Sequence, residues 1–193
     1  MCGIAGFVNL DGAPADASVV AGMMSTIRHR GPDDRGQIAL SLRRGEIAGA
    51  ADATADTGIG FHRLNILDLS ERGHQPMANP SETIVIAFNG EIYNAFDYKA
   101  GLEAAGFQFR SRTDTEVLLY LYEQCGLEGM LERLNGMFAL VIVDLRTHEV
   151  HIARDHFGIK PLYWTQSGSS VLFASEAKAF LAHPAFRAEI DED

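Results

Sequence analysis

The sequence predicts an α+β sandwich. Its strand-like segments follow one another in runs and its helical segments are grouped between them, so the strict strand–helix alternation of a parallel α/β fold is absent. Hydrophobic residues make up 47% of the 193 residues and charged residues 22%, the composition of an ordinary soluble globular protein. This length suits one domain.

The first half of the chain is predicted to be mostly strands, with one helix. Apolar residues three and four positions apart indicate that helix, which should stop before Gly31-Pro32 because proline disfavours helix in the preceding residue. We expect a polar surface loop in the segment 43–57, apart from one short strand. The expected strands are 2–9, 37–42, 46–49, 58–64 and 83–89, and the apolar helix positions are Val20, Met23, Met24 and Ile27.

The second half is predicted to contain two helices, a group of strands and a short last helix. Residues 98–105 form the first helix, which Gly106 closes. The sequence Thr113-Asp-Thr-Glu116 is a capping box, in which Thr113 caps the next helix and Glu116 reaches back. Core-facing residues of that helix are Val117, Leu118, Tyr120 and Leu121. The remaining elements are strands 137–143, 150–154, 162–165 and 171–174 and helix 176–181.

Charge and composition exclude several classes of partner. Acidic residues outnumber basic ones by 26 to 16, giving a net charge of −10, which argues against binding to nucleic acid or to anionic membranes. Two cysteines cannot build a disulfide framework, and no signal peptide or membrane-length apolar run is visible, so we expect a cytoplasmic protein. His148 and His151 should point to opposite faces, and no metal site is expected.

Cys2 is the most informative single residue. A cysteine at position two is usually incidental. If Met1 is removed, however, the residue carries both a thiol and a free α-amine whose reference pKa of about 7.7–8.0 allows it to accept a proton near neutral pH. A nucleophile and a general base then share one residue.

Two further positions have both a structural and a functional interpretation, and a third has a structural one. Asn89-Gly90 is typical of a hairpin turn, but an amide and a glycine N–H can also form an oxyanion hole. Arg63 on a strand suits a surface ion pair, or a two-pronged clamp on a carboxylate. Asp114 suits the positive end of a helix dipole.

Five segments taken together are far more specific than any one of them. In order they are Met1-Cys-Gly-Ile-Ala-Gly, Arg28-His-Arg-Gly-Pro-Asp33, Phe88-Asn-Gly-Glu-Ile-Tyr-Asn94, Arg112-Thr-Asp-Thr-Glu116 and Ala153-Arg-Asp-His-Phe-Gly-Ile-Lys-Pro-Leu-Tyr163. They resemble the N-terminal glutaminase domain of asparagine synthetases, a class II glutamine amidotransferase of the N-terminal-nucleophile hydrolase type. The resemblance extends to about residue 181.

That resemblance implies a four-layer αββα sandwich with two antiparallel sheets and a set of site residues. Cys2 would attack the side-chain amide of L-glutamine, and its α-amine would act as the base. Asn89 and the Gly90 N–H would stabilise the oxyanion. The substrate-binding residues would be Arg63 at the α-carboxylate, Glu91 and Asp114 at the α-ammonium, and the backbone around Leu64 and Ile66. His29, Arg30, Asp33 and the stretch 154–163 look mainly structural.

The resemblance also leaves the identity of the whole protein open. Residues 1–181 would form the glutaminase domain and 182–193 the start of a linker, because no Ser-Gly-Gly-x-Asp-Ser phosphate loop is present. We expect no cofactor in this domain, with ATP and magnesium used only by a synthetase domain or subunit that receives the ammonia. The alternatives are a sugar or peptide carboxylate acceptor, an inactive interaction module that keeps Met1, and a separate subunit. A homodimer is a further expectation.

Overall fold

The computed structural model describes residues 1–49 and 52–189, which form two antiparallel β-sheets with helices outside them. One sheet has six strands in the order β3-β2-β4-β1-β10-β9, and the other has four in the order β5-β6-β7-β8. The strands are β1 (Gly3–Asn9), β2 (Asp34–Ser41), β3 (Glu46–Ala48), β4 (Thr57–Arg63), β5 (Met77–Ala78), β6 (Ile84–Ile92), β7 (Gly136–Asp144), β8 (Glu149–Arg154), β9 (Tyr163–Ser167) and β10 (Ser170–Ala174). The α-helices are α1 (Ala17–Thr26), α2 (Lys99–Ala104) and α3 (Asp114–Leu131), and 3₁₀ helices span η1 (Arg28–Arg30), η2 (Glu71–Gly73), η3 (Ala95–Tyr98) and η4 (Ala177–Ala182).

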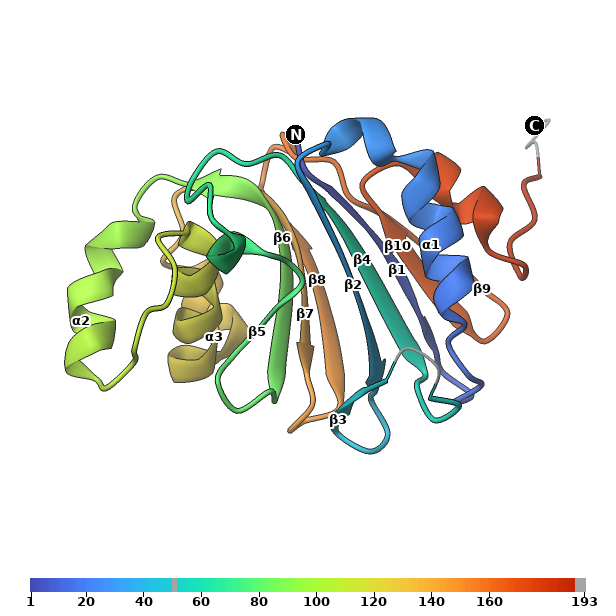
Figure 1. The fold of residues 1–193 in the computed structure, drawn as a ribbon, viewed down its shortest axis with the longest axis horizontal. Helices are drawn as coiled ribbons and strands as arrows, with labels where there is room; N and C mark the ends of the chain where they lie inside the picture. The colour runs from blue at the N-terminus through green and yellow to red at the C-terminus, as the bar shows by residue number, and fades with distance from the viewer. Residues whose placement is uncertain (50–51, 190–193) are drawn as a thin grey trace.

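The elements stack in four layers, as the resemblance implied. Figure 1 shows α2 and α3 outside the four-stranded sheet, the two sheets side by side, and α1 with the chain that follows β10 outside the six-stranded sheet. The start of β1 and the end of β6 lie at the same upper edge of the two sheets. The predicted αββα sandwich is therefore confirmed.

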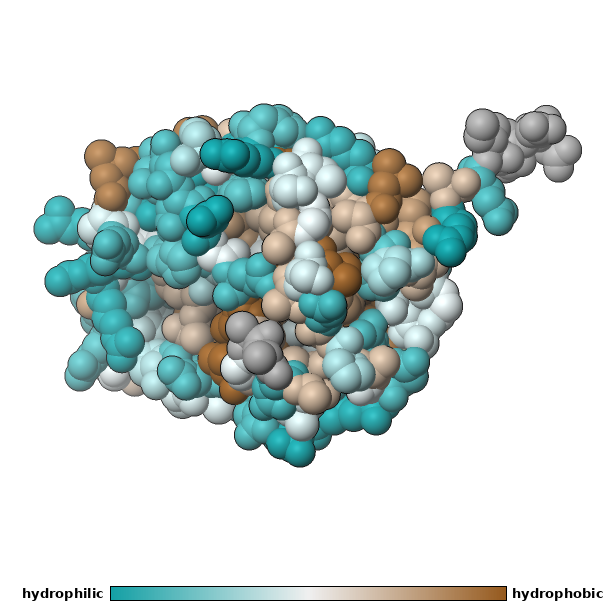
Figure 2. Space-filling view, turned by 45° about the vertical axis from the view of Figure 1, so that its right-hand side comes forward, coloured by the Kyte–Doolittle hydropathy of each residue, from teal (hydrophilic) through white to brown (hydrophobic). Residues whose placement is uncertain are grey.

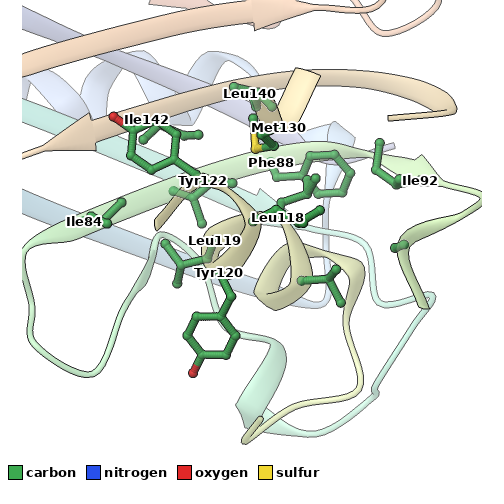
Figure 3. Close-up of a cluster of buried hydrophobic side chains, with 14 of the residues drawn as sticks. Ile84, Phe88, Ile92, Leu118, Leu119, Tyr120, Tyr122, Met130, Leu140 and Ile142 are labelled. Carbon is green, nitrogen blue, oxygen red and sulfur yellow. The ribbon is translucent and has the colours of Figure 1, made fainter. Parts of the chain in front are cut away.

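Three clusters of buried hydrophobic residues fill the three interfaces between these layers. One lies between the four-stranded sheet and α3, and Figure 3 shows its side chains, among them Phe88, Leu118 and Leu140. A second fills the space between the two sheets, and the third lies beneath α1 and η4. Each layer is held by its own apolar interface.

Strand β1 has apolar residues on both faces because both of its faces are covered. Ile4 and Val8 belong to the cluster between the sheets, whereas Ala5 and Phe7 pack against the α1 layer. A strand buried on both faces has no reason to alternate polar and apolar residues. This explains why the opening run of the sequence is almost entirely apolar.

Helix α1 approaches the six-stranded sheet closely because glycines line the strand beneath it. A Cβ on Gly60 of β4 would come within 2.3 Å of Met24 Cγ, and one on Gly58 within 2.5 Å of Val20 Cγ2. The missing side chains of these glycines leave room for the helix. The other face of β4 carries Ile59 and Phe61, which pack toward the second sheet.

Most predicted elements are present, with several differences. Strand β6 continues to Ile92 and pairs Asn89 with Ala139 and Gly90 with Phe138, so the hairpin-turn interpretation of Asn89-Gly90 is wrong. The short strand β5 was not predicted. Strand β2 begins at Asp34, earlier than predicted, because it pairs with β4 from Asp34 opposite Arg63 onward. The last helix is the 3₁₀ helix η4. In the capping box, Thr113 Oγ1 accepts from the Glu116 N–H at 3.3 Å as predicted. The expected return bond is wrong, since the Glu116 carboxylate accepts from the N–H groups of Arg110 and Ser111 instead.

Two surface segments bear on further predictions. After η4 the chain still packs on the sandwich. The ring of His183 meets the ring of Phe7 edge-on, with 4.6 Å between the ring centroids, and the ring centroids of Phe186 and Phe180 are 5.7 Å apart. Positions 50–51 of the predicted loop and 190–193 of the predicted linker lie outside the described residues.

Hydrophilic side chains cover most of the face in Figure 2, with hydrophobic ones in separate patches between them. Among the described residues, no helix combines the length and the hydropathy needed to cross a bilayer.

Candidate active site

Most of the predicted site residues surround one pocket at the shared edge of the two sheets. The pocket lies where β1 begins, where β4 and β6 end, and where α3 begins. It is lined by Cys2, Arg63, Leu64, Ile66, Leu67, Gly73, Gln75, Phe88, Gly90, Glu91, Thr113, Asp114 and Thr115. Residues separated by more than a hundred positions in sequence thus meet at one place.

The thiol of Cys2 sits against the end of β4. Its sulfur lies 3.4 Å from the Leu64 nitrogen, from which it accepts a hydrogen bond, and 3.7 Å from the Leu64 carbonyl oxygen. Burial raises the pKa of the thiol above its ordinary value, while the Leu64 N–H and the charges of the terminal amine, Arg63 and Lys160 act in the opposite direction. Arg30 fixes the backbone of the same residue, because its Nε donates to the Cys2 carbonyl at 2.8 Å.

Asn89 and Gly90 lie near the end of β6, on the opposite sheet. Asn89 is on the face of the strand that carries Val85 and Ala87, and this face packs toward the first sheet. The residue is 2% exposed, and its Nδ2 donor has no hydrogen-bond partner in the part of the chain that the structure describes. A buried donor without a partner costs about 1–3 kcal/mol, so its retention calls for an explanation. Asn89 does not line the pocket surface, whereas Gly90 does.

Arg63 is buried beside the pocket, and the loop after β4 already occupies much of its guanidinium. Nη1 donates to the Ser70 carbonyl at 3.2 Å, and Nη2 donates to the carbonyls of Leu67 and Asp68 at 2.9 and 2.6 Å. Among residues 1–49 and 52–189, three of the five N–H groups of the guanidinium are used, and two remain for another acceptor. Arg63 holds the loop that forms one wall of the pocket, a role the sequence did not reveal.

Asp114 and Glu91 place two carboxylates at the opposite wall. Asp114 is the first residue of α3, and its oxygens accept from the N–H groups of Ile92 at 3.1 Å and Thr115 at 2.9 Å. Burial raises the pKa of Asp114 to about 6, and the nearby charge of Glu91 adds to this shift. A cationic group entering the pocket would favour the ionised carboxylate. The pocket thus has a cationic wall at Arg63 and an anionic wall at Asp114.

Comparisons with known proteins agree with this arrangement. A family model described as a glutamine amidotransferase domain matches residues 1–193. The chain belongs to this family.

Curated relatives of this glutamine amidotransferase domain include several much longer proteins. Asparagine synthetase [glutamine-hydrolyzing] 2 of Bacillus subtilis is 38% identical over 188 residues, which cover 95% of this chain and 23% of the relative. Asparagine synthetase [glutamine-hydrolyzing] 3 of Arabidopsis thaliana is 38% identical over 182 residues, or 93% of this chain and 28% of the relative. The chain therefore spans about a quarter of the length of these relatives.

Solved structures show the same fold as the amidotransferase domain. One of them is glutamine phosphoribosylpyrophosphate amidotransferase of B. subtilis, solved with ADP and GMP. It superposes with a TM-score of 0.77 at 23% sequence identity. The matched region covers 94% of this chain and 43% of the solved chain. At this level of identity the comparison supports the fold alone.

The domain contains functional contacts that sequence reasoning missed. Gln75, Gly73 and Thr115 line the pocket. Arg30 supports the backbone of Cys2, which is a structural role of the kind the resemblance implied. No sequence motif marks Gln75, because its contacts depend on the pairing of distant strands. Thr115 lies within the segment 112–116, but that motif gave it no role of its own. In the described residues, no three His, Cys, Asp or Glu side chains gather where a metal ion could bind.

Proposed function

We propose that this domain hydrolyses L-glutamine to L-glutamate and ammonia through a γ-glutamyl thioester on Cys2. The observation that carries the proposal is the pocket itself, which brings a thiol, an arginine and two carboxylates together. A thiol supplies the nucleophile, and the charged walls suit an amino acid. Membership of the glutamine amidotransferase family identifies glutamine as the substrate class.

The charged walls provide a way to select a zwitterion. The two free N–H groups of Arg63 would bind the α-carboxylate, and Asp114 with Glu91 would bind the α-ammonium. Leu64 and Ile66 would complete the pocket through their backbones, at the inner wall and at the rim. A site that bonds both charges rejects amides that lack them, because its own buried polar groups would be left unpaired.

The chemistry would take place between the two sheets. With Met1 removed, the α-amine of Cys2 takes the thiol proton as the sulfur attacks the side-chain carbonyl carbon of glutamine. Asn89 Nδ2 and the Gly90 N–H donate to the oxyanion, which gives the unpartnered amide its role. The amine then protonates the leaving nitrogen, ammonia departs, and water hydrolyses the thioester. Neither a metal ion nor an organic cofactor enters this sequence.

The ammonia would pass to a synthetase domain or subunit that uses ATP and magnesium. Relatives named asparagine synthetases favour aspartate as its final acceptor. Residues 182–193 would be the start of the connection. Cys2 and Cys125 are both free thiols, which suits a reducing cytoplasmic setting. A homodimer stays a prediction.

The test is a glutaminase assay on protein whose intact mass shows that it begins at Cys2. Glutamate and ammonia should form in equal amounts without ATP, and an acid-quenched sample should carry a glutamyl adduct. Cys2→Ala should lose both the activity and the adduct, with an unchanged circular dichroism spectrum.

A preparation that retains Met1 is the matched control for the base. Met1 is 54% exposed and turns the Cys2 amine into an amide, which is not a base. It should therefore be inactive at every pH. Equal rates with and without Met1 would exclude the α-amine as the base, and turnover by Cys2→Ala would exclude the thiol as the nucleophile.

A further inference from the structure

Strand β5 leaves the edge of β6 just before the site, and a side chain continues its pairing. β5 pairs Met77 with Ile86 and Ala78 with Val85. The same register would place residue 75 opposite Phe88, but the strand has ended, and Pro76 has no N–H to donate to a ladder. The residue before this proline is Gln75, whose side chain is almost completely buried.

The amide of Gln75 replaces the missing backbone partner of Phe88. Its Oε1 accepts from the Phe88 N–H at 2.6 Å, and its Nε2 donates to the Phe88 carbonyl at 3.2 Å. One side chain thus reproduces both hydrogen bonds of a strand neighbour at the residue directly before Asn89. Nε2 also donates its second hydrogen to Oγ1 of Thr115, with 3.3 Å between the nitrogen and the oxygen. Thr115 is the residue directly after Asp114.

We infer that Gln75 is a positioning residue that fixes the oxyanion-hole strand and the start of α3 relative to each other. This inference rests on the proposed function. Both hydrogens of the Gln75 amide are used by protein groups, so it acts through its neighbours. Phe88 precedes the two proposed oxyanion donors, and Thr115 follows the proposed ammonium-binding carboxylate. A shift of about 1 Å in groups of this kind can cost about a hundredfold in rate.

The chain offers a matched control at the other end of the same strand. Asn79 is also a buried amide, 2% exposed, and its Oδ1 accepts from the Ile84 N–H at 3.0 Å. It supports the beginning of β6, whereas Gln75 supports the end that reaches the pocket. The Asn79 amide makes five hydrogen bonds and the Gln75 amide three, so removing Asn79 should cost at least as much stability. Only the loss of Gln75 should affect catalysis.

The experiment compares Gln75→Met and Asn79→Leu in protein that begins at Cys2, using kcat, KM and the urea midpoint. We expect Gln75→Met to lower kcat by about 10- to 100-fold and, because it also loses the Thr115 contact, to raise KM at least threefold. Asn79→Leu should keep kcat within about twofold although its loss of stability is at least as large. Thr115→Val removes only the contact with α3, and it should raise the KM for glutamine at least threefold through Asp114.

The outcomes separate this inference from the proposed function. If the unaltered protein releases no glutamate, the proposed function fails and the inference fails with it. If that protein is active and the two amide variants lose kcat equally, Gln75 is only structural and this inference alone is overturned. Should Gln75→Met not fold, Thr115→Val decides, because an unchanged KM would overturn the role of the bridge.

Discussion

Replacing Asp114 by asparagine should make the free protein more stable at neutral pH while weakening its binding of glutamine. Burial raises the pKa of Asp114 to about 6 from an ordinary value of 3.8. The folded state thus binds a proton more tightly than the unfolded state, so the stability due to this group falls as pH rises from 3.8 through 6. The difference of about 2.2 pKa units corresponds to about 3 kcal/mol of cost above pH 6.

The substitution also removes one hydrogen-bond acceptor. Asparagine can accept from only one of the two N–H groups, of Ile92 and Thr115, that the carboxylate serves, which costs about 1 kcal/mol. We therefore expect Asp114→Asn to be about 2 kcal/mol more stable than the parent protein at pH 8 and nearly equal to it at pH 4. Its KM for glutamine should rise at least tenfold, because the ammonium group loses its charged partner.

Urea unfolding from pH 4 to 8, followed by far-ultraviolet circular dichroism, measures this difference. Trp164 is 66% exposed and makes a poor fluorescence probe. Asp97→Asn, at an exposed aspartate in η3, is the control for removing one negative charge from an acidic protein. A stability difference between Asp114→Asn and the parent that stays constant across this pH range would refute the reasoning.

Three other predictions test separate parts of the structure. Asn89→Leu should lower kcat about a hundredfold or more without loss of urea stability, because the buried Asn89 Nδ2 has no partner among the described residues. A destabilised but active variant would contradict the assignment of Asn89. Arg63→Ala should raise the KM for glutamine and speed proteolysis of the loop after β4, whose carbonyls it holds; unchanged proteolysis would show that the loop does not depend on it. Gly6→Ala should cost about 3 kcal/mol in urea unfolding, because its Cβ would lie 2.3 Å from the Gly58 carbonyl oxygen, whereas Gly101→Ala in α2 meets nothing within 4 Å and should gain about 1 kcal/mol; equal effects would refute the packing argument.

The sequence predicted best what depends on local pattern. The apolar run of β6 and the core-facing positions of α3 follow from periodicity, and Thr113 caps its helix because a hydroxyl at that position meets a free N–H. Residues such as Cys2 and Asp114 were found through motifs that resemble a known family, and the fold then brought them to one pocket.

What the sequence could not predict depends on contacts between distant segments. The carboxylate of Glu116 serves Arg110 and Ser111 because the chain before the helix turns back over it. The carbonyls that occupy Arg63 come from the path of a loop, which has no periodic pattern. The role of Gln75 depends on the register between β5 and β6, and a single sequence does not contain that register.

The arrangement of the site on two different sheets makes the apolar core between them a spacer. Cys2 directly precedes β1 of the six-stranded sheet, and the proposed oxyanion donors lie on β6 of the four-stranded one. Side chains between the sheets, such as Phe61, Val85 and Ala87, would therefore set the gap for the reacting carbonyl of the proposed mechanism. A slightly larger or smaller side chain there would move one sheet relative to the other by a fraction of an ångström. Such a change leaves a folded protein but misaligns nucleophile and donors. The packing between the two sheets thus decides how well the nucleophile and the donors are aligned. A change in this packing should lower activity before it unfolds the protein.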